Sequence, residues 1–509
     1  MSLLPSLAIT ALLGTETESA VLPAVPHPLD AALARVGDTD DREAALLNLA
    51  SVAGLAELAG YVPAVAASPA PAAQPETLPI IPEAAASLLR RILAGEFEDV
   101  LPEFLQRTAQ KHMRLPAEAL PAILNLGKYD LRPVVQQVIG ERGRWLAAQN
   151  PAWAYALQRD PREAWEDGDR LERVAALEAL RGEDPAHARA LAESTWSQES
   201  GDDRAAFLTA FAIGLAMADE PFLEACLDDR RKGVRTAAQA LLVRLPQSRL
   251  VQRTLTRLNR FVRLKSRLLG GDSFEISLPE TLDADARRDG VFDDAGDMVQ
   301  YRRMGEKASW LAAMLSLVTP ALLSRQWGKS PEKILAAALA SEWNKPLIVG
   351  LCAATQFSQD AAWAEALVAL WLKQETCRTL LGRESLWALV ALLPGRVLEV
   401  LLATNLQPRT TDPTDGVSLL ALLGGYRRPW TDKMARLIVQ NARRLATGRG
   451  RGYEFSHAFP SFALWISPSL AGEFSRGWPD QPGGGWQGRL DEFLALLDFR
   501  RQLHEAFDR

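Results

Sequence analysis

The chain has 509 residues, a formal net charge of −6 and 48% hydrophobic residues. This length exceeds what one compact core accommodates, so we expect several domains or an elongated solenoid. The acidic balance excludes a chain-wide polycation that would coat nucleic acid. Alanine and leucine, which favour helix, dominate the composition and β-branched residues are sparse, so we predict an all-α protein.

The cysteines and the N-terminus indicate the cellular compartment in which we expect the protein. Cys226, Cys352 and Cys377 are far apart and odd in number, which argues against a disulfide framework or a CxxC metal pair. We expect buried free thiols in a reducing environment. The apolar N-terminus lacks the basic region of a signal peptide, and no stretch reaches the roughly 18 apolar residues of a spanning helix. These features predict a soluble cytoplasmic protein.

From the N-terminus, residues 1–61 predict a short helical segment. Residues 62–83 are rich in proline and alanine, and proline at this density cannot continue a helix, so we predict a linker there. Residues 84–268 predict a helical block. Its helix starts at Pro151, Pro185 and Pro221 are 34 and 36 residues apart (185 minus 151, 221 minus 185). This spacing is typical of helical-hairpin repeats, although Asp160-Pro161 makes them irregular.

The stretch from Asp228 to Leu245 carries the clearest repeat signature. An acid precedes a Val-Arg pair by a few residues, and a helix follows. Its apolar residues recur at i, i+3, i+4, i+7, i+8 and i+11, at Val234, Ala237, Ala238, Leu241, Leu242 and Leu245. This pattern resembles the second helix of a HEAT repeat, whose apolar face is buried by stacking on its neighbours. We therefore predict an irregular HEAT-like helical-hairpin solenoid in two helical blocks.

Residues 230–268 form a basic segment with twelve arginines or lysines and no acid. On a helix turning about 100° per residue, six arginines share one face opposite an apolar face; they are Arg249, Arg253, Arg257, Arg260, Arg263 and Arg267. One interpretation is a solvated face, or arginines paired with acids of the next repeat, for which residues 163–203 are available. The others are an acidic protein partner or nucleic acid. We hypothesise that an acidic protein surface binds the exposed arginines.

Residues 269–305 predict an interdomain insertion. Gly270-Gly271-Asp272 ends the helix, and alternation from Phe274 to Pro279 predicts one short strand. Asp293 to Asp297 match a DDxxD pattern, which holds magnesium–diphosphate when it lies on a helix. Here a glycine interrupts the pattern and no second acidic helix matches it, so we interpret it as an exposed acidic loop.

Residues 306–509 predict a second helical block with a loop-rich C-terminal region and a last helix at 488–507. Gly448 to Gly452 lacks the GK[ST] ending of a phosphate-binding loop. The chain contains neither an HExxH nor a GxSxG motif, and its five histidines have no ligand spacing. We therefore predict a protein that is not an enzyme, with no catalytic residue, cofactor or metal.

Several segments together resemble a bacterial domain-of-unknown-function family of HEAT-like helical proteins. They are Ala11–Glu16, Arg142–Trp153, Asp219–Arg235, Leu278–Glu280, Arg288–Gly290 and Gly305–Leu311. Members are often encoded beside a MoxR-type AAA ATPase, a SWIM zinc-finger protein and a von Willebrand factor A domain protein. Where the family usually has basic residues after Gly-Thr-Glu, this chain has Thr17-Glu18. The resemblance implies an adaptor in an ATPase-linked system and no catalytic residues.

These observations predict a non-enzymatic scaffold or adaptor for protein–protein interaction. Its partner has an acidic surface, and the resemblance implies the AAA ATPase or the von Willebrand factor A domain protein. The alternative is a nucleic-acid-binding helical repeat that uses the basic face of residues 230–268. Binding to phosphates weakens steeply with salt, so the salt dependence separates these two functions. We predict no membrane partner.

Overall fold

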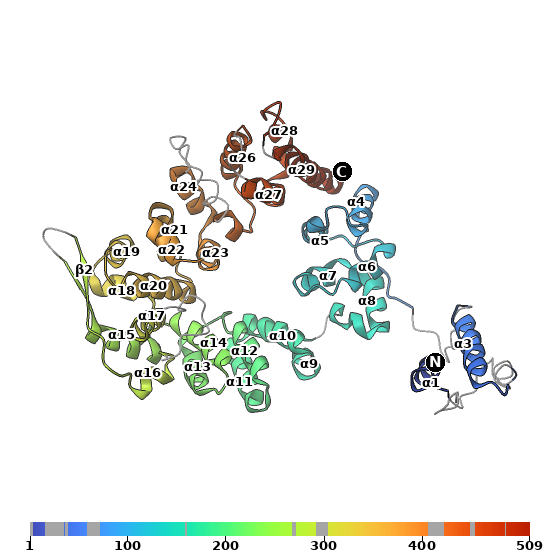
Figure 1. Cartoon of the computed structure of the whole chain (residues 1–509), viewed down its shortest axis with the longest axis horizontal. Coiled ribbons are helices and arrows are strands. Elements are labelled where there is room, and N and C mark those ends of the chain that lie inside the picture. The colour runs from blue at the N-terminus through green and yellow to red at the C-terminus, as the bar shows by residue number, and fades with distance from the viewer. Residues whose placement is uncertain are drawn as a thin grey trace. The chain divides into compact units, whose positions relative to one another are not determined.

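The computed structural model describes most of the chain, in the residue ranges given at the end of this paragraph. Helices joined by short turns dominate, with two short strands among the described residues (Figure 1). The prediction of an all-α helical-repeat fold is confirmed. Contacts divide the chain into two compact units, Met1–Ala72 and Ala73–Arg509. The described ranges are 4–15, 35, 39–58, 72–157, 160–266, 271–291, 304–405, 422–447, 453–483 and 485–508.

The first unit contains two described helices, α1 (Leu4–Leu13) and α3 (Arg42–Leu58). They contact each other through a small apolar core of Leu7, Leu49 and Ala53. Asp41 caps α3 by accepting hydrogen bonds from the backbone amides of the next turn, as short acidic residues do at helix starts. Of the predicted linker, only the part from residue 72 onward is described.

The second unit begins with short helices that start at prolines. Pro102, Pro121 and Pro133 occupy the first turns of α5, α6 and α7, where the missing N–H removes no helical hydrogen bond. The helices of this part are α4 (Glu83–Leu93), α5 (Leu101–Gln110), α6 (Leu120–Asn125), α7 (Arg132–Val138) and α8 (Gly140–Gln149).

Helical hairpins continue through residue 261, and their starts agree with the sequence signals. Asp184 caps α11 by accepting hydrogen bonds from two backbone amides, and Asn150 caps a 3₁₀ turn by accepting one from the amide of Ala152. In α14 the predicted stripe is packed inside, with Val234 and Leu241 buried. The helices are α9 (Pro161–Asp167), α10 (Arg170–Glu183), α11 (Pro185–Thr195), α12 (Gly201–Ala210), α13 (Glu220–Ala225), α14 (Lys232–Val243) and α15 (Arg249–Phe261).

The prediction that helix continues to residue 268 is wrong. Helix α15 ends at Phe261, and β1 (Val262–Lys265) pairs antiparallel with β2 (Ser273–Ile276). The reason is a change of period: Val262 is buried and Leu264 half-buried, with charged residues between and after them. The strand predicted near Phe274 is β2, and β1 was missed. The DDxxD segment and residues 448–452 lie outside the described residues.

The remaining helices extend the same hydrophobic core, which reaches from Ile81 to Phe507. Helix α20 packs on both α17 and α14, so the two predicted helical blocks share this core. The helices are α16 (Ala284–Arg288), α17 (Glu306–Ser316), α18 (Pro320–Trp327), α19 (Pro331–Leu339), α20 (Asn344–Ser358), α21 (Ala361–Lys373), α22 (Glu375–Leu380), α23 (Arg383–Leu392), α24 (Gly395–Asn405), α26 (Asp432–Ala446), α27 (Tyr453–Phe462), α28 (Ala471–Phe474) and α29 (Trp486–Asp508).

None of the described helices has, by itself, the length and apolar character needed to cross a bilayer. Helices α17 and α18, which meet at a 95° bend, reach that length and composition only when they are taken together. The predicted last helix is present as α29, which packs against α27 and also against α4, near the start of the unit.

Candidate functional site

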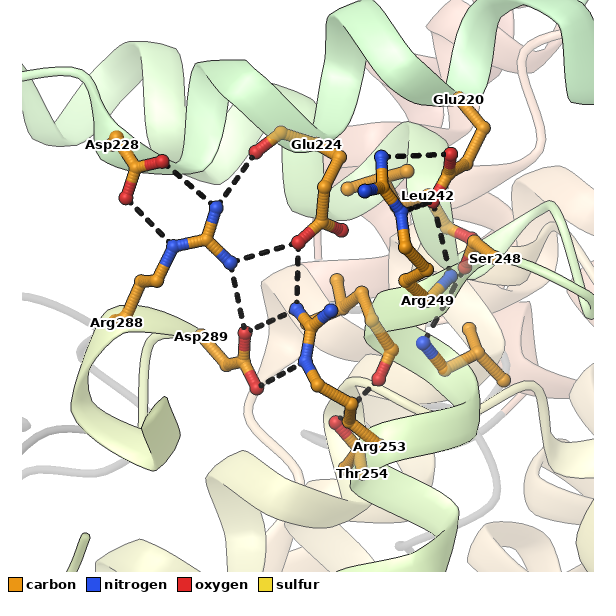
Figure 2. Close-up of polar contacts among 12 residues, drawn as sticks. Glu220, Glu224, Asp228, Leu242, Ser248, Arg249, Arg253, Thr254, Arg288 and Asp289 are labelled. Carbon is orange, nitrogen blue, oxygen red and sulfur yellow. Dashed lines mark hydrogen bonds and ion pairs between the residues drawn. The ribbon is translucent and has the colours of Figure 1, made fainter. Parts of the chain in front are cut away.

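The arginines of the basic segment meet carboxylates from two other helices. In Figure 2 the guanidinium groups of Arg253 and Arg288 both point toward Glu224 and Asp289. An Nη of Arg253 lies 2.8 Å from Glu224 and 2.6 Å from Asp289, and an Nη of Arg257 lies 2.8 Å from Asp289. Helices α13 and α15 and the end of α16 are therefore joined by one network of ion pairs.

Three further pairs belong to this arginine–carboxylate network. Arg249 donates to Glu220 at 2.8 Å, and Arg288 donates to Asp228 at 2.7 Å and to Glu224 at 2.8 Å (Figure 2). The network contains Arg249, Arg253, Arg257 and Arg288 with Glu220, Glu224, Asp228 and Asp289. The carboxylate of Asp283 also lies 3.8 Å from Arg257, so the acids outnumber the arginines.

A tight turn after α16 places Asp289 in the network. The side chain of Asp289 is fully buried. Its backbone carbonyl accepts a hydrogen bond from Gln239 on α14 at 2.9 Å. Gly290 follows with φ +97°, and a Cβ there would lie 2.1 Å from the Gln239 side-chain nitrogen. Only glycine fits both the backbone angle and the space.

The ion pairs change the acidity of the network. The hydrogen bond from Arg249 is the main cause that lowers the pKa of Glu220 below its ordinary value, and the hydrogen bond from Arg288 lowers the pKa of Asp228 in the same way. Hydrogen bonds to Asp228 and Glu224 raise the pKa of Arg288. Glu220 and Asp228 therefore remain ionised at neutral pH.

The predicted partner-binding arginines differ in burial and in pairing. Arg257 is buried, with 10% of its side chain exposed, and Arg253 has 30% exposed, so the expectation that these two line a free outer face is wrong. Arg249 is more exposed but also paired. Arg260 and Arg263 are exposed, and Arg263 lies in β1 and not in a helix. Arg267 lies outside the described residues.

The alternative of internal pairing holds for three arginines, but with different acids than we expected. Residues 163–203 were the expected source, whereas the carboxylates come from α13 and from the turn after α16. The acids of residues 163–203 pair elsewhere: Glu199 with Arg173 and Asp203 with Arg170. Sequence proximity does not identify an ion-pair partner across a turn of the solenoid.

A family model matches residues 6–507, nearly the whole chain. The chain belongs to the DUF5691 family, a family of unknown function. Neither the search of curated proteins nor the search of solved structures gives a match. In this DUF5691 protein, two of the segments that carried the resemblance, Asp219–Arg235 and Arg288–Gly290, meet in the arginine–carboxylate network.

Sequence reasoning missed a second feature, an arginine ladder through three successive hairpins. Arg173, Arg204 and Arg235 are spaced by 31 residues (204 minus 173, 235 minus 204). Arg173 pairs with Glu199 at 2.5 Å, and Arg204 pairs with Asp229 at 2.9 Å. Arg235 donates to the backbone carbonyl of Asp229, as Arg204 does to that of Glu199. A search for arginines at the repeat period would have found them.

Inside the same layers lies a fully buried ion pair. Arg181 donates two hydrogen bonds of 2.9 Å to Asp219, and Arg189 donates a third at 2.8 Å. Burial alone would raise the pKa of Asp219, but the bonds from Arg181 and Arg189 outweigh it and hold the pKa below its ordinary value. The guanidinium of Arg181 also lies over the Phe211 ring, 4.5 Å from its centre. This pair joins α10 to the start of α13.

The three cysteines, which could act as nucleophiles, are buried. The prediction of buried free thiols is confirmed, and burial raises the pKa of Cys226, Cys352 and Cys377 to about 12. Thiols with such a pKa are weak nucleophiles. Within the described ranges, no group of three or more His, Cys, Asp or Glu is arranged to hold a metal ion.

A cavity of about 450 Å³ lies between α7, α9 and α10. Its walls are mostly apolar, and two of its polar groups have partners: the Tyr155 hydroxyl donates to the Leu124 carbonyl, and Glu172 belongs to the capping box of α10. Arg132 lies over the Tyr155 ring, 4.7 Å from its centre. The cavity therefore offers mainly shape and apolar contact.

Proposed function

We propose that this DUF5691 protein is a non-enzymatic helical-repeat scaffold or adaptor that binds other proteins. One observation carries the proposal: the hairpins of the second unit share one core from Ile81 to Phe507, and arginine–carboxylate pairs join successive layers. Solenoids of this kind hold extended surfaces in a fixed arrangement, which suits binding of protein partners. The ion pairs restrict sliding between layers and therefore favour a stable surface.

The proposed partner has an acidic surface, and the family resemblance implies a MoxR-type AAA ATPase or a von Willebrand factor A domain protein of the same cytoplasmic system. Arg260 and Arg263 are exposed arginines of the predicted basic face, as is Arg249, which pairs with Glu220. A planar guanidinium can bind a carboxylate in a two-point fork. Because three arginines of that face pair with carboxylates of the chain, less positive charge faces solvent than the sequence indicates. This favours a protein partner over nucleic acid.

The test is capture of partners by the tagged full-length chain from its host, identified by mass spectrometry, followed by binding of the purified AAA ATPase and von Willebrand factor A domain protein. We expect Arg260→Glu/Arg263→Glu to weaken capture most at low salt. The matched control is Arg162→Glu/Lys373→Glu, which makes the same charge change at exposed sites elsewhere. Equal capture by both double variants would contradict the proposed surface.

The same variants distinguish the nucleic-acid alternative. The wild type is mixed with duplex and single-stranded DNA over a salt series, because phosphate contacts make affinity fall steeply with salt. We expect no retardation near physiological salt. Retardation by the wild type that Arg260→Glu/Arg263→Glu abolishes would replace the scaffold proposal with the nucleic-acid one.

A further inference from the structure

The last helix of the second unit contacts the first helices of the same unit. The Phe499 ring lies 4.8 Å from that of Phe97, and the Phe507 ring lies 5.3 Å from that of Phe104 on α5. Phe104, Phe499 and Phe507 are buried there. Residues separated by about 400 positions in the sequence thus form one interface, in which α29 packs on α4 and α5.

Ion pairs surround this apolar contact, and Glu103 lies at their centre. Glu103 on α5 accepts hydrogen bonds from Arg500 and contacts a ring nitrogen of His504 at 2.7 Å. Next to it, Asp508 pairs with Arg107 and with Lys111, each at 2.8 Å. Side chains at the end of α29 therefore hold α5 through charges, of which Arg500 is buried and Glu103, His504 and Asp508 retain partial access to water.

The two halves of α29 are held differently. Its first half belongs to the C-terminal helices, because Phe493 stacks on Phe459 of α27 at 4.3 Å and Trp486 contacts the same ring at 5.4 Å. Arg500 also donates to the backbone carbonyls of Ala463 and Ile466, which follow α27. Breaking the contact with α5 would therefore leave α29 in place on α27.

Two residues that flank α5, on the side of the interface opposite α29, have strained backbone angles. Phe97, immediately before the 3₁₀ turn Glu98–Val100 that leads into α5, has φ +53°, and His112, just after α5, has φ +51°. Left-handed backbone is unfavourable for a residue as bulky as phenylalanine and persists only where contacts hold it. Strain of this kind recurs at elements that switch between two arrangements.

We propose that residues 499–508 are a releasable clasp, which closes the solenoid of the second unit by holding α5 through Glu103 and opens when the Glu103 ion pairs are lost, while both ends stay folded. The clasp combines an apolar contact of two ring pairs, ion pairs that are partly accessible to water, and backbone strain in the segments that flank α5. Its opening would separate the first helices from the last ones and change the surface that the solenoid presents. The inference does not depend on the identity of any partner.

The test measures the distance between spin labels at Ser87→Cys on α4 and Gln502→Cys on α29, both exposed positions. The native cysteines are buried and escape labelling. We expect one narrow, short distance in the wild-type background and a second, longer population with Glu103→Gln. Glu98→Gln, an exposed acid just before α5, is the matched control and should leave the distribution unchanged. Circular dichroism checks that each variant keeps its helix content.

A second variant keeps the proposal testable if Glu103→Gln fails to fold. His504→Ala/Asp508→Ala removes two clasp residues from the last turns of α29, where both are partly exposed, and should also produce the longer population. The proposal is overturned if the wild type lacks the short distance, if neither clasp variant lengthens it, or if dilution alone lengthens it, because the contact would then form between copies of the chain.

Discussion

At the scale of single residues, Asp289 is the buried carboxylate that pairs with two arginines of the network. Its carboxylate is fully buried and lies against both Arg253 and Arg257. The removal of one member of a buried ion pair leaves the other charge buried without compensation. The resulting loss of stability exceeds the small stability difference between an intact buried ion pair and an apolar replacement of the pair. The network therefore makes Asp289 more critical to stability than any of its exposed arginines.

We predict that Asp289→Ala lowers the free energy of unfolding by about 3–5 kcal/mol, because two arginines lose their buried partner. Urea unfolding followed by far-UV circular dichroism measures this change. Asp285→Ala, an exposed acid in the same short helix α16, is the control and should stay within about 0.5 kcal/mol of the wild type. An Asp289→Ala value as small as that of the control would show that the network does not hold the layers together.

The lowered pKa values of Glu220 and Asp228 predict how stability depends on pH. Both have lower pKa values when folded than when unfolded, mainly because of hydrogen bonds from Arg249 and Arg288. Their contribution to folding stability is thus complete at pH values above the pKa of the unfolded carboxyls, near 4. It is lost as the pH falls through the lower pKa values of the folded state. We expect urea midpoints to be similar at pH 7 and about 5 and to drop below about pH 4.

The control for the pH prediction is Glu220→Gln/Asp228→Asn, which cannot lose these two charges. Its urea midpoint should start lower at pH 7 and fall less steeply below about pH 4 than that of the wild type. Parallel curves for the two proteins would mean that other carboxylates cause the acid response.

At the scale of elements, α14 shows how a helix face is used inside the solenoid. Its Asp–Val–Arg signature and apolar period predicted the buried stripe, and Val234 and Leu242 are fully buried in the structure. This success is local, since a period of 3.6 residues needs only the helix itself. The end of α15 was not predicted, because Val262 leaves the helix to pair with Ile276 across a turn, and strand pairing depends on residues distant in the sequence.

We predict that Leu241→Ala destabilises the second unit by about 2–5 kcal/mol through lost burial and a cavity. Leu241 is 6% exposed in the structure, whereas Val400 on α24 is 58% exposed. Val400→Ala is therefore the control and should change little. Thermal and urea unfolding of both variants provide the comparison. A Leu241→Ala effect under about 0.5 kcal/mol would place the stripe outside the core.

At the scale of the whole molecule, the chain consists of two units with separate cores. One core contains Leu7, Leu49 and Ala53, and the other extends from Ile81 to Phe507. A unit with its own continuous core is expected to fold alone. The second unit also contains the arginine ladder, the arginine–carboxylate network and the clasp.

We predict that a chain starting at Ala73 folds without the first unit. Its circular dichroism should be mainly helical, well above the roughly one-third average of globular proteins, and its urea midpoint should match that of the full chain. The complementary piece, residues 1–72, is the contrasting sample, because its small core gives little stability. An insoluble or unfolded 73–509 chain would show that the two units need each other.

Much of the architecture was accessible from the sequence alone. The helical class, the helix starts at Pro151 and Pro185, and the stripe of α14 are properties of neighbouring residues. Composition, capping residues and period act within one or two helical turns, so each can be evaluated without knowing the fold. The family resemblance drew on the same short segments, and the family match over residues 6–507 confirmed that the chain belongs to such a family.

Only the tertiary structure decided which charges meet. The sequence showed six arginines on one face and left their partners open, but Arg253 and Arg257 pair with Asp289, 36 and 32 residues further along the chain. Glu103 and Arg500 meet across 397 residues. An ion pair depends on distances of a few ångströms between side chains, and distance along the sequence does not determine these. The sequence by itself therefore determined most of the helices, and the packing of the layers decided which arginines are paired inside the solenoid and which are exposed.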